Sequence, residues 1–289
     1  MKSAHISKED NFREFYESVG QRYPEEEFVY RTLRGRVRKE FIVSYLKEFH
    51  GRFLDLGCNR GMYLELYQNG GRVGVDIAYS VVAIAKQRFP RSNVVQGDAQ
   101  NLQFLRSNSF DSILCSEMIE HVPLPDKVIS GCFRILRPGG RLLITTPNYK
   151  RQKPAWISIG SMKKHGIQGV KQDAYFHTAF RPEELKNLVE EAGFRVLEFG
   201  TFEKEVKYST RIPVSFYHTL AIMNKFILKS EKIAQLNESM LEQGSLIIYR
   251  MCCFLGLNKI LTALVKEGVR TFLLAEKFTR SEPNQHSHE

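Results

Sequence analysis

The stretch Phe53-Leu54-Asp55-Leu56-Gly57-Cys58-Asn59-Arg60-Gly61 decides how the rest of this chain is expected to fold. An apolar run ends there in an acid and a glycine-bearing turn, and a helical pattern follows. A second apolar run, Arg72-Val73-Gly74-Val75-Asp76, ends in another acid. Gly57 and Gly61 carry no Cβ, so the backbone can turn sharply and come close to a ligand. This order is typical of a strand–helix–strand unit with a ligand site at the carboxyl ends of both strands.

The two acids and the glycine turn together indicate the kind of ligand. Asp76 follows Gly57 by nineteen residues, which is the position of a ribose-diol acceptor in nucleotide-binding units. Asp55 would repel a pyrophosphate but attract an ammonium group, and the third glycine of the dinucleotide fingerprint is missing. An acid for an amine and an acid for a diol fit S-adenosylmethionine.

The chain resembles the class I S-adenosylmethionine-dependent methyltransferases over about residues 40–203 and again over 270–280. The first motif of that family is an acid-x-Gly-x-Gly-x-Gly turn, in which Asn59 replaces the middle glycine here. Asn is the non-glycine residue that best tolerates a positive φ, so the turn is expected to survive. Three further motifs follow in the family's order, at Val94–Ala99, Phe110–Glu117 and Leu136–Ile144.

The resemblance implies an α/β fold, a Rossmann-like doubly wound sheet of seven strands that is mainly parallel with the last strand antiparallel. The expected strands are Arg52–Leu56, Arg72–Asp76, Asn93–Gln96, Phe110–Cys115, Arg141–Thr146, Phe194–Phe199 and Thr271–Lys277. The helices expected within this domain are Met62–Asn69, Tyr79–Phe89, Pro125–Leu136 and one that ends at Gly193.

Four parts of the chain are expected from these patterns. Residues 1–49 form an N-terminal helical cap, residues 50–203 with 270–280 form the cofactor-binding domain, and residues 281–289 are a polar tail. Residues 204–269 are a helical insertion between strands six and seven, with helices near 213–243 and 245–267. Its basic residues lie among apolar ones, which suits a roof over the acceptor pocket, helices on an anionic membrane, or a dimer face.

The candidate site residues follow from the resemblance and from the strand ends. Contact with the cofactor is expected from Asp55, Gly57, Cys58, Gly61, Asp76, Ile77, Asp98, Ala99, Ser116 and Glu117. In the resembled family the acid at Asp98 usually bonds the adenine amino group. His121 and His177 are the candidate catalytic residues, since histidine can accept a proton near neutral pH. A structural role, such as capping a helix, is the alternative for His121.

Two further ligand-binding hypotheses are weaker. The spacing of Glu117 and His121 would put both on one helical face beside Glu120, and such sets bind several metals, but no metal is assigned. The N-terminal helices of the resembled family often close over the cofactor, so Tyr23, Arg31 and Arg34 are candidates to reach it, although a solvated basic face is favoured.

The sequence after the fourth strand indicates the reaction. Residues 116–122, Ser-Glu-Met-Ile-Glu-His-Val, resemble the ubiquinone-biosynthesis O-methyltransferases and their relatives that act on small molecules, lipids and glycans. This implies O-methylation of a small-molecule, lipid-linked or glycan hydroxyl. One alternative is a nucleic-acid methyltransferase that uses the basic loop 149–176 around Trp156. The other is a non-catalytic protein that only binds S-adenosylmethionine.

Composition narrows the setting but not the substrate. The 289 residues carry a net charge of +10, which suits a polyanion or an anionic membrane touched through residues 204–269, or serves solubility alone. Five unevenly spaced cysteines favour reduced thiols in a cytoplasmic protein. No secretory signal and no run of eighteen apolar residues is found, so no membrane span is expected. The oligomeric state is left open.

Overall fold

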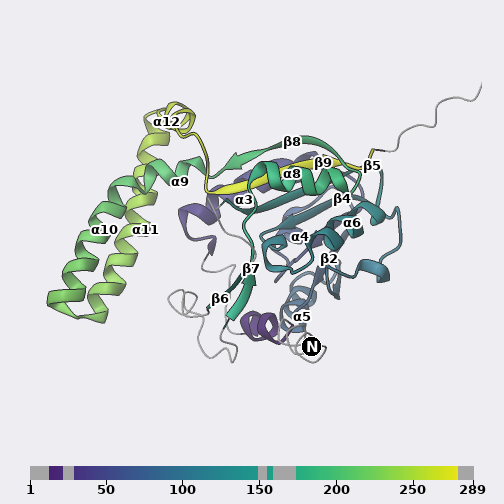
Figure 1. The fold of residues 1–289 in the computed structure, drawn as a ribbon, viewed down its shortest axis with the longest axis horizontal. Helices are drawn as coiled ribbons and strands as arrows, with labels where there is room; N and C mark the ends of the chain where they lie inside the picture. Colours follow the sequence, from purple (N-terminus) through teal and green to yellow (C-terminus); the bar gives the residue numbers. More distant parts are fainter. Residues whose placement is uncertain (1–12, 22–28, 149–154, 159–173, 279–289) are drawn as a thin grey trace, which may run out of the picture.

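The computed structural model describes residues 13–21, 29–148, 155–158 and 174–278 (Figure 1). Its main element is a seven-stranded sheet in the order β3-β2-β1-β4-β5-β9-β8. The strands from β3 to β5 pair in parallel, whereas β9 lies antiparallel to both β5 and β8. The predicted fold class, including the antiparallel last strand, is confirmed.

The strand ends lie close to their predicted positions. The strands are β1 Phe53–Leu56, β2 Arg72–Asp76, β3 Asn93–Gln96, β4 Phe110–Ser116, β5 Leu136–Pro147, β8 Arg195–Phe202 and β9 Arg270–Glu276. The largest difference is β5, which begins five residues earlier than the predicted Arg141 because Leu136 pairs with Phe110 across an irregularity in the ladder with β4. A separate two-stranded ribbon is made by β6 Ala155–Ser158 and β7 Ala174–His177.

Helices cover both faces of the sheet. They are α3 Leu33–Glu48, α4 Met62–Leu66, α5 Tyr79–Arg88, α6 Pro125–Ile135 and α8 Pro182–Glu191, with single turns η1 Leu102–Phe104 and η2 Ile119–His121. Adjacent residues of a central strand point to opposite faces. Thus Ile113 of β4 joins the core under α6 and α8, and its neighbour Leu114 joins the core under α3, α4 and α5. With both faces covered, the carboxyl ends of the parallel strands are where a ligand site is expected.

The insertion between β8 and β9 is a helical hairpin that projects away from the sheet (Figure 1). It contains α9 Lys204–Ser209, α10 Arg211–Met223, the π-helical turn η3 Asn224–Leu228, α11 Glu231–Phe254 and α12 Asn258–Leu264. In the described residues no single helix is long and apolar enough to cross a membrane, although α11 and α12 together pass that test across a bend of 115°.

The predicted helix break near residue 244 is wrong. Gly244 lies inside α11, where it packs against Pro213 of α10 and where a Cβ would stand at an ordinary contact distance of 3.4 Å from Pro213 Cγ. The chain instead reverses at Lys229, which has a φ of 47°. The side chain of Asn224 holds this reversal, because its Oδ1 accepts the Ser230 N–H at 2.9 Å and its Nδ2 donates to the Ser230 carbonyl at 2.9 Å.

Candidate active site

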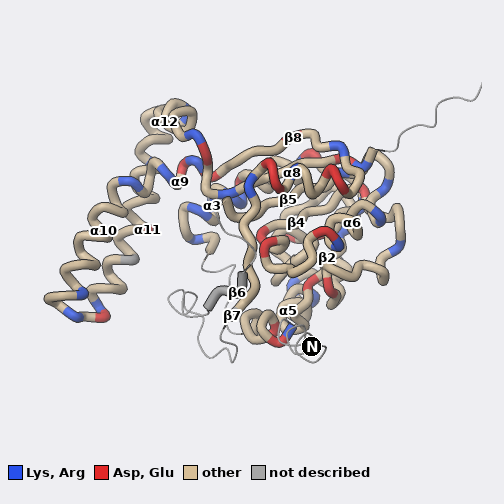
Figure 2. The backbone as a smooth tube through the Cα atoms, viewed as in Figure 1, with Lys and Arg blue, Asp and Glu red and all other residues tan. Residues whose placement is uncertain are grey.

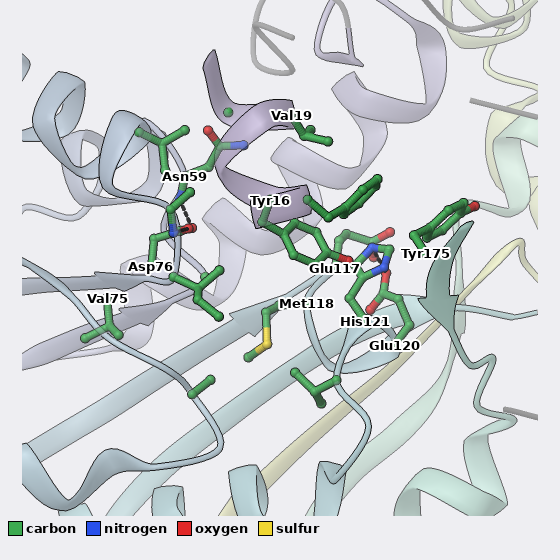
Figure 3. A pocket seen from close by; sticks show the side chains of 18 of the residues that line it. Tyr16, Val19, Asn59, Val75, Asp76, Glu117, Met118, Glu120, His121 and Tyr175 are labelled. Atoms are coloured by element: carbon green, nitrogen blue, oxygen red, sulfur yellow. Dashed lines mark hydrogen bonds and ion pairs between the residues drawn. The ribbon is translucent and has the colours of Figure 1, made fainter. Parts of the chain in front are cut away.

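A cavity of about 420 Å³ lies at the carboxyl ends of β1, β2 and β4 (Figure 3). Its walls come from the helical residues 13–21, from the turn after β1, from the loops after β2, β3 and β4, and from β7 and β9. One part is lined by Asp76, Asp98 and apolar side chains, and the other by two histidines, two tyrosines, two glutamates and two arginines. The two parts have different chemistry, so each is described separately.

Asp76 is the acid of the first part whose position is best defined. Its Oδ2 accepts the backbone N–H of Asn59 at 2.9 Å, and its Oδ1 accepts that of Ala78 at 3.0 Å. Burial raises the pKa of Asp76, and these backbone hydrogen bonds oppose the shift. Asp98 lies on the same wall, with Oδ1 accepting the Gln100 N–H at 2.8 Å. The two carboxyls therefore offer acceptors to hydroxyl or amino groups of a ligand.

The turn after β1 comes close to the residues that follow β4. Gly57 has a φ of 82°, and a Cβ there would stand 2.8 Å from Cγ of Met118. Asn59 has a φ of 46°, so the expectation that asparagine replaces a glycine in the left-handed region is confirmed. The absence of a side chain at Gly57 thus leaves room for Met118, whose side chain lines the cavity.

Six of the ten residues predicted to contact the cofactor line the cavity: Gly57, Asp76, Ile77, Asp98, Ala99 and Glu117. The other four, Asp55, Cys58, Gly61 and Ser116, are not among the lining residues. Asp55 and Cys58 are buried behind the turn, with exposed fractions of 2% and 4%. Ser116 is hydrogen-bonded with Thr145, 2.9 Å between the hydroxyl oxygens. Direct contact of the cofactor with these four residues stays a prediction.

The N-terminal segment covers the cavity, but through other residues than those considered from the sequence. Tyr23 lies outside the described residues, and Arg31 and Arg34 are exposed and do not line the cavity. Instead Tyr16 lines it, with its ring 5.8 Å from that of His121. Glu17 holds this segment in place by accepting the Ser80 N–H at 3.1 Å at the start of α5.

His121 and His177 come together in the second part of the cavity, with ring centroids 5.3 Å apart. Burial, together with the neighbouring His177, lowers the pKa of His121 to about 4. Burial and Arg270 lower the pKa of His177 as well. Nδ1 of His121 has no hydrogen-bond partner within the described residues, and Figure 3 shows its ring between Tyr16 and Tyr175. A neutral imidazole with a vacant ring nitrogen is suited to accept a proton.

Glu120 is a buried carboxyl beside His121, with Oε1 lying 3.8 Å from Nε2 of the histidine. Burial and the nearby Glu117 raise its pKa well above the usual range. Its Oε2 accepts the Thr146 hydroxyl at 3.2 Å. The predicted helical spacing of Glu117 and His121 is wrong, because Glu117 has a φ of 53° and η2 begins only at Ile119. Within the described ranges no group of three or more His, Cys, Asp or Glu residues is placed to hold a metal.

A buried ion cluster closes the cavity behind the histidines, and sequence reasoning missed most of it. Glu117 Oε2 lies 2.8 Å from Arg270 Nε and 3.4 Å from an Arg38 amino group. Arg38 Nε also donates to Glu203 Oε1 at 3.0 Å. Burial alone would raise the pKa of Glu117, but the two arginines outweigh it and the pKa is lowered. For Glu203 burial wins over the arginines, and its pKa is raised.

This cluster joins segments far apart in the chain, from α3, β4, the end of β8 and the start of β9. No local sequence pattern predicts this ion pair, because Arg38 and Glu203 are 165 residues apart. The only sequence signal is that Arg38 stands at a buried position of its helix, next to Val37. Buried charges need partners, so a helix arginine on the apolar side is the feature that points to a distant acid.

Replacing Arg38 with methionine should destabilise the protein by about 3–5 kcal/mol, because Glu203 and Glu117 would keep their buried charges with one arginine fewer. Urea unfolding measures this loss. Arg36→Met, two residues away at an exposed position, is the matched control and should change little. Equal stability of the two variants would contradict a structural role for the cluster.

Comparisons with known proteins show similarity to methyltransferases. A family model described as a methyltransferase domain matches residues 54–144. The ubiquinone biosynthesis O-methyltransferase of Coxiella burnetii is 28% identical over 169 residues, 56% of this chain and 71% of that protein. The enzyme of the same name from Xanthomonas axonopodis pv. citri is 28% identical over 193 residues, 62% of this chain and 80% of that protein.

Solved structures resemble the fold. Phosphoethanolamine N-methyltransferase 2 of Haemonchus contortus, solved in complex with S-adenosyl-L-methionine, has a TM-score of 0.55 at 18% identity, covering 93% of this chain and 60% of that one. The [4+2]-cyclase SpnF has a TM-score of 0.53 at 18% identity, covering 86% and 82%. Because one of these proteins is a cyclase, the likeness speaks for the architecture and not for the reaction.

Proposed function

Because this chain belongs to the class I S-adenosylmethionine-dependent methyltransferases, we propose that it transfers the methyl group to a hydroxyl oxygen of a small-molecule acceptor. The cofactor is S-adenosylmethionine, which supplies an activated methyl group on a sulfonium when it is bound. The observation that carries the choice of a hydroxyl is the neutral His121 in the cavity wall, whose Nδ1 has no hydrogen-bond partner among the described residues. A hydroxyl must lose a proton on methylation, and this nitrogen can take it.

The first part of the cavity has the chemistry that the cofactor needs. Asp76 would accept the ribose hydroxyls and Asp98 the adenine amino group, as carboxylates accept from such donors. Apolar side chains beside them, those of Ile77, Val81 and Met118, suit the flat adenine ring. These residues fit S-adenosylmethionine. They do not fit a pyrophosphate, because the charged groups among them, Asp76 and Asp98, would repel it.

The second part of the cavity would orient the acceptor and move its proton. His121 remains neutral near pH 7 because its pKa is lowered to about 4, so it is ready to act as a base. Once protonated, its charge would lie near Glu117 and 3.8 Å from Glu120 Oε1. His177 and Tyr175 lie beside the ring, with ring centroids 5.3 Å and 6.2 Å from that of His121, and would position the acceptor. A methyl transfer requires the protein to position the acceptor and to remove its proton.

The acceptor we propose is a small-molecule, lipid-linked or glycan hydroxyl. The names of the curated relatives, which are ubiquinone biosynthesis O-methyltransferases, support O-methylation of a small molecule. The comparisons favour a small molecule over a nucleic acid. The basic loop 149–176, on which the nucleic-acid alternative depends, lies mostly outside the described residues.

We also infer a contact with an anionic membrane through residues 204–269, in a protein that otherwise works in the cytoplasm. The exposed apolar side chains of this insertion and its lysines support the contact. Another use of the insertion, as a roof over the acceptor pocket, has no support, because none of the cavity-lining residues comes from 204–269.

The direct test is a transfer assay with radiolabelled S-adenosylmethionine and a panel of catechols, quinols, polyprenyl-linked phenols, glycans and total RNA. The expected product is a methyl ether, identified by mass spectrometry. Label found on nitrogen or in RNA would contradict the proposal. The absence of any labelled product, from protein that binds the cofactor, would contradict it as well.

A further inference from the structure

The exposed apolar side chains of this protein are concentrated in the insertion between β8 and β9. Within the described residues, sixteen of the twenty-two exposed large apolar side chains lie between Ile212 and Leu264. Those found elsewhere are Tyr79, Val95, Phe104, Leu124, Leu197 and Phe278, which are scattered over the domain. Single exposed apolar residues are normal on a protein surface, but a concentration of this kind marks an interaction site.

The hairpin tip, residues 222–232, is the part where these side chains are most crowded. Ile222, Met223, Phe226, Ile227 and Leu228 are exposed by 61%, 42%, 68%, 73% and 42%. On a helical path, positions this close in sequence point around most of the circumference. A protein partner would cover one face of the tip, whereas a surrounding apolar medium would cover all of them.

The tip is also basic. Lys225, Lys229 and Lys232 lie among or beside the apolar side chains, against one described acid, Glu231, and Figure 2 shows the lysines at the end of the hairpin. The ammonium of Lys225 lies 5.4 Å from the ring centroid of Phe226. Lysine can keep its stem in an apolar layer while its charge stays at the level of lipid headgroups. Apolar and basic side chains mixed in this way are complementary to an anionic bilayer surface.

The rest of the hairpin differs from the tip. Along α11 the exposed residues Leu236, Met240, Ile247 and Met251 are spaced by four and seven, so they form a single stripe. Such a stripe would also suit a helix of a second copy of this chain. The tip does not share this pattern, and Figure 1 shows it at the far end of the hairpin from the sheet. The tip therefore favours a membrane over a second copy.

We propose that residues 222–232 insert into the headgroup and upper acyl region of an anionic bilayer and anchor the protein peripherally. The inference deepens the membrane contact proposed above and rests on it, but it does not depend on methyl transfer. An anchor of this kind needs no spanning helix. It would hold the cavity near the surface at which a lipid-linked acceptor is found.

Binding of the full chain to vesicles tests the proposal. We expect cosedimentation with vesicles of phosphatidylcholine mixed with phosphatidylglycerol, and much weaker binding to phosphatidylcholine alone. The double variant Phe226→Glu/Ile227→Glu should lower the partition constant at least about 30-fold, because two apolar side chains that the bilayer would bury are lost. Changing Lys225, Lys229 and Lys232 to glutamine should weaken binding and remove much of its salt dependence.

The control is Leu197→Glu, which places one glutamate at an exposed apolar position of β8, away from the hairpin. It should bind vesicles like the unchanged protein. Calorimetric titration with S-adenosylhomocysteine reports the cofactor site separately, and the tip variants should keep that affinity. Equal vesicle binding by the tip variant and the unchanged protein would overturn the proposal. A dimer in solution that the tip variant dissociates, with no vesicle binding, would assign the surface to a second copy instead.

Discussion

Asp76→Ala should weaken the binding of S-adenosylmethionine by about 100-fold or more. The variant removes the carboxyl that we assign to the ribose hydroxyls, and hydrogen bonds to a charged acceptor contribute about 1.5–3 kcal/mol each. The same carboxyl accepts the N–H groups of Asn59 and Ala78, so a part of the loss comes from a looser turn. Calorimetric titration of the variant with S-adenosylmethionine measures the change in the dissociation constant.

Two controls separate binding from folding for this variant. Asp126→Ala removes an exposed acid at the start of α6, outside the cavity, and should leave cofactor affinity unchanged. Circular dichroism of Asp76→Ala should show a folded protein, since the core does not depend on this carboxyl. A folded variant with undiminished affinity would refute the assignment of the ribose diol to Asp76.

His121→Gln should lower the rate of methyl transfer by about 10²–10⁴-fold while S-adenosylmethionine binds as before. Glutamine has a similar size but cannot take the acceptor's proton, and a positioned base contributes about this factor. His218→Gln, at an exposed position of α10, is the matched control and should keep full activity. Unreduced transfer by the His121 variant would make that histidine a structural residue, the alternative that the sequence leaves open.

The pH dependence of transfer offers a second readout for His121. Only the neutral imidazole is a base, and the protonated form appears as the pH falls through its pKa. Since that pKa is lowered to about 4, kcat/KM should stay level from neutral pH down to about pH 5 and fall below it. An ordinary histidine would already lose activity near pH 6.5. A midpoint near that value would contradict the buried, neutral state of His121.

The same pKa has a consequence for stability. The unfolded chain protonates His121 near pH 6.5, while the folded protein does so only near pH 4. Protons therefore bind preferentially to the unfolded state between these values, and the contribution of His121 destabilises the fold as the pH falls through this window. Rates at low pH accordingly need a parallel check that the protein is still folded.

The architecture could be predicted because its signals are local. The apolar runs that end in Asp55 and Asp76, with a turn after the first, specify β1, β2 and the ligand edge between them. The side chains of Ile113 and Leu114 point to opposite faces of β4, but the sequence shows no alternation because both faces are apolar. Such an apolar run is itself typical of a strand covered on both faces. Strand β9 was predicted from its own alternation, although seventy residues separate it from β8 in the predicted order.

The site was predictable only where a residue acts from its own strand end. Asp76 is the last residue of β2, Asp98 lies two residues after the end of β3, and both line the cavity. Asp55 follows the same rule but lies at a fully buried strand position, and a sequence does not tell which way a strand-end carboxyl points. Arg38, Glu203 and the spacing around Glu117 depend on tertiary contacts and on a left-handed backbone at Glu117, for which the sequence has no signal.

In the insertion, the sequence predicts helices but not the position at which the chain reverses. Glycine weakens a helix, which predicts a break at Gly244, but the helix α11 continues through this residue, which packs against Pro213. The true reversal depends on Asn224, whose side chain bonds both backbone groups of Ser230. Asparagine stabilises turns by such bonds, so this signal was present but weaker than the glycine.

Titration calorimetry of the unchanged protein with S-adenosylhomocysteine, and with NAD as the control, tests the central claim most directly. The claim is that the cavity between Asp76 and His121 is an S-adenosylmethionine site. Binding of the adenosyl ligand in the micromolar range, lost in Asp76→Ala, with no binding of NAD, is the predicted result. Binding of NAD, or no binding of S-adenosylhomocysteine by folded protein, would contradict it.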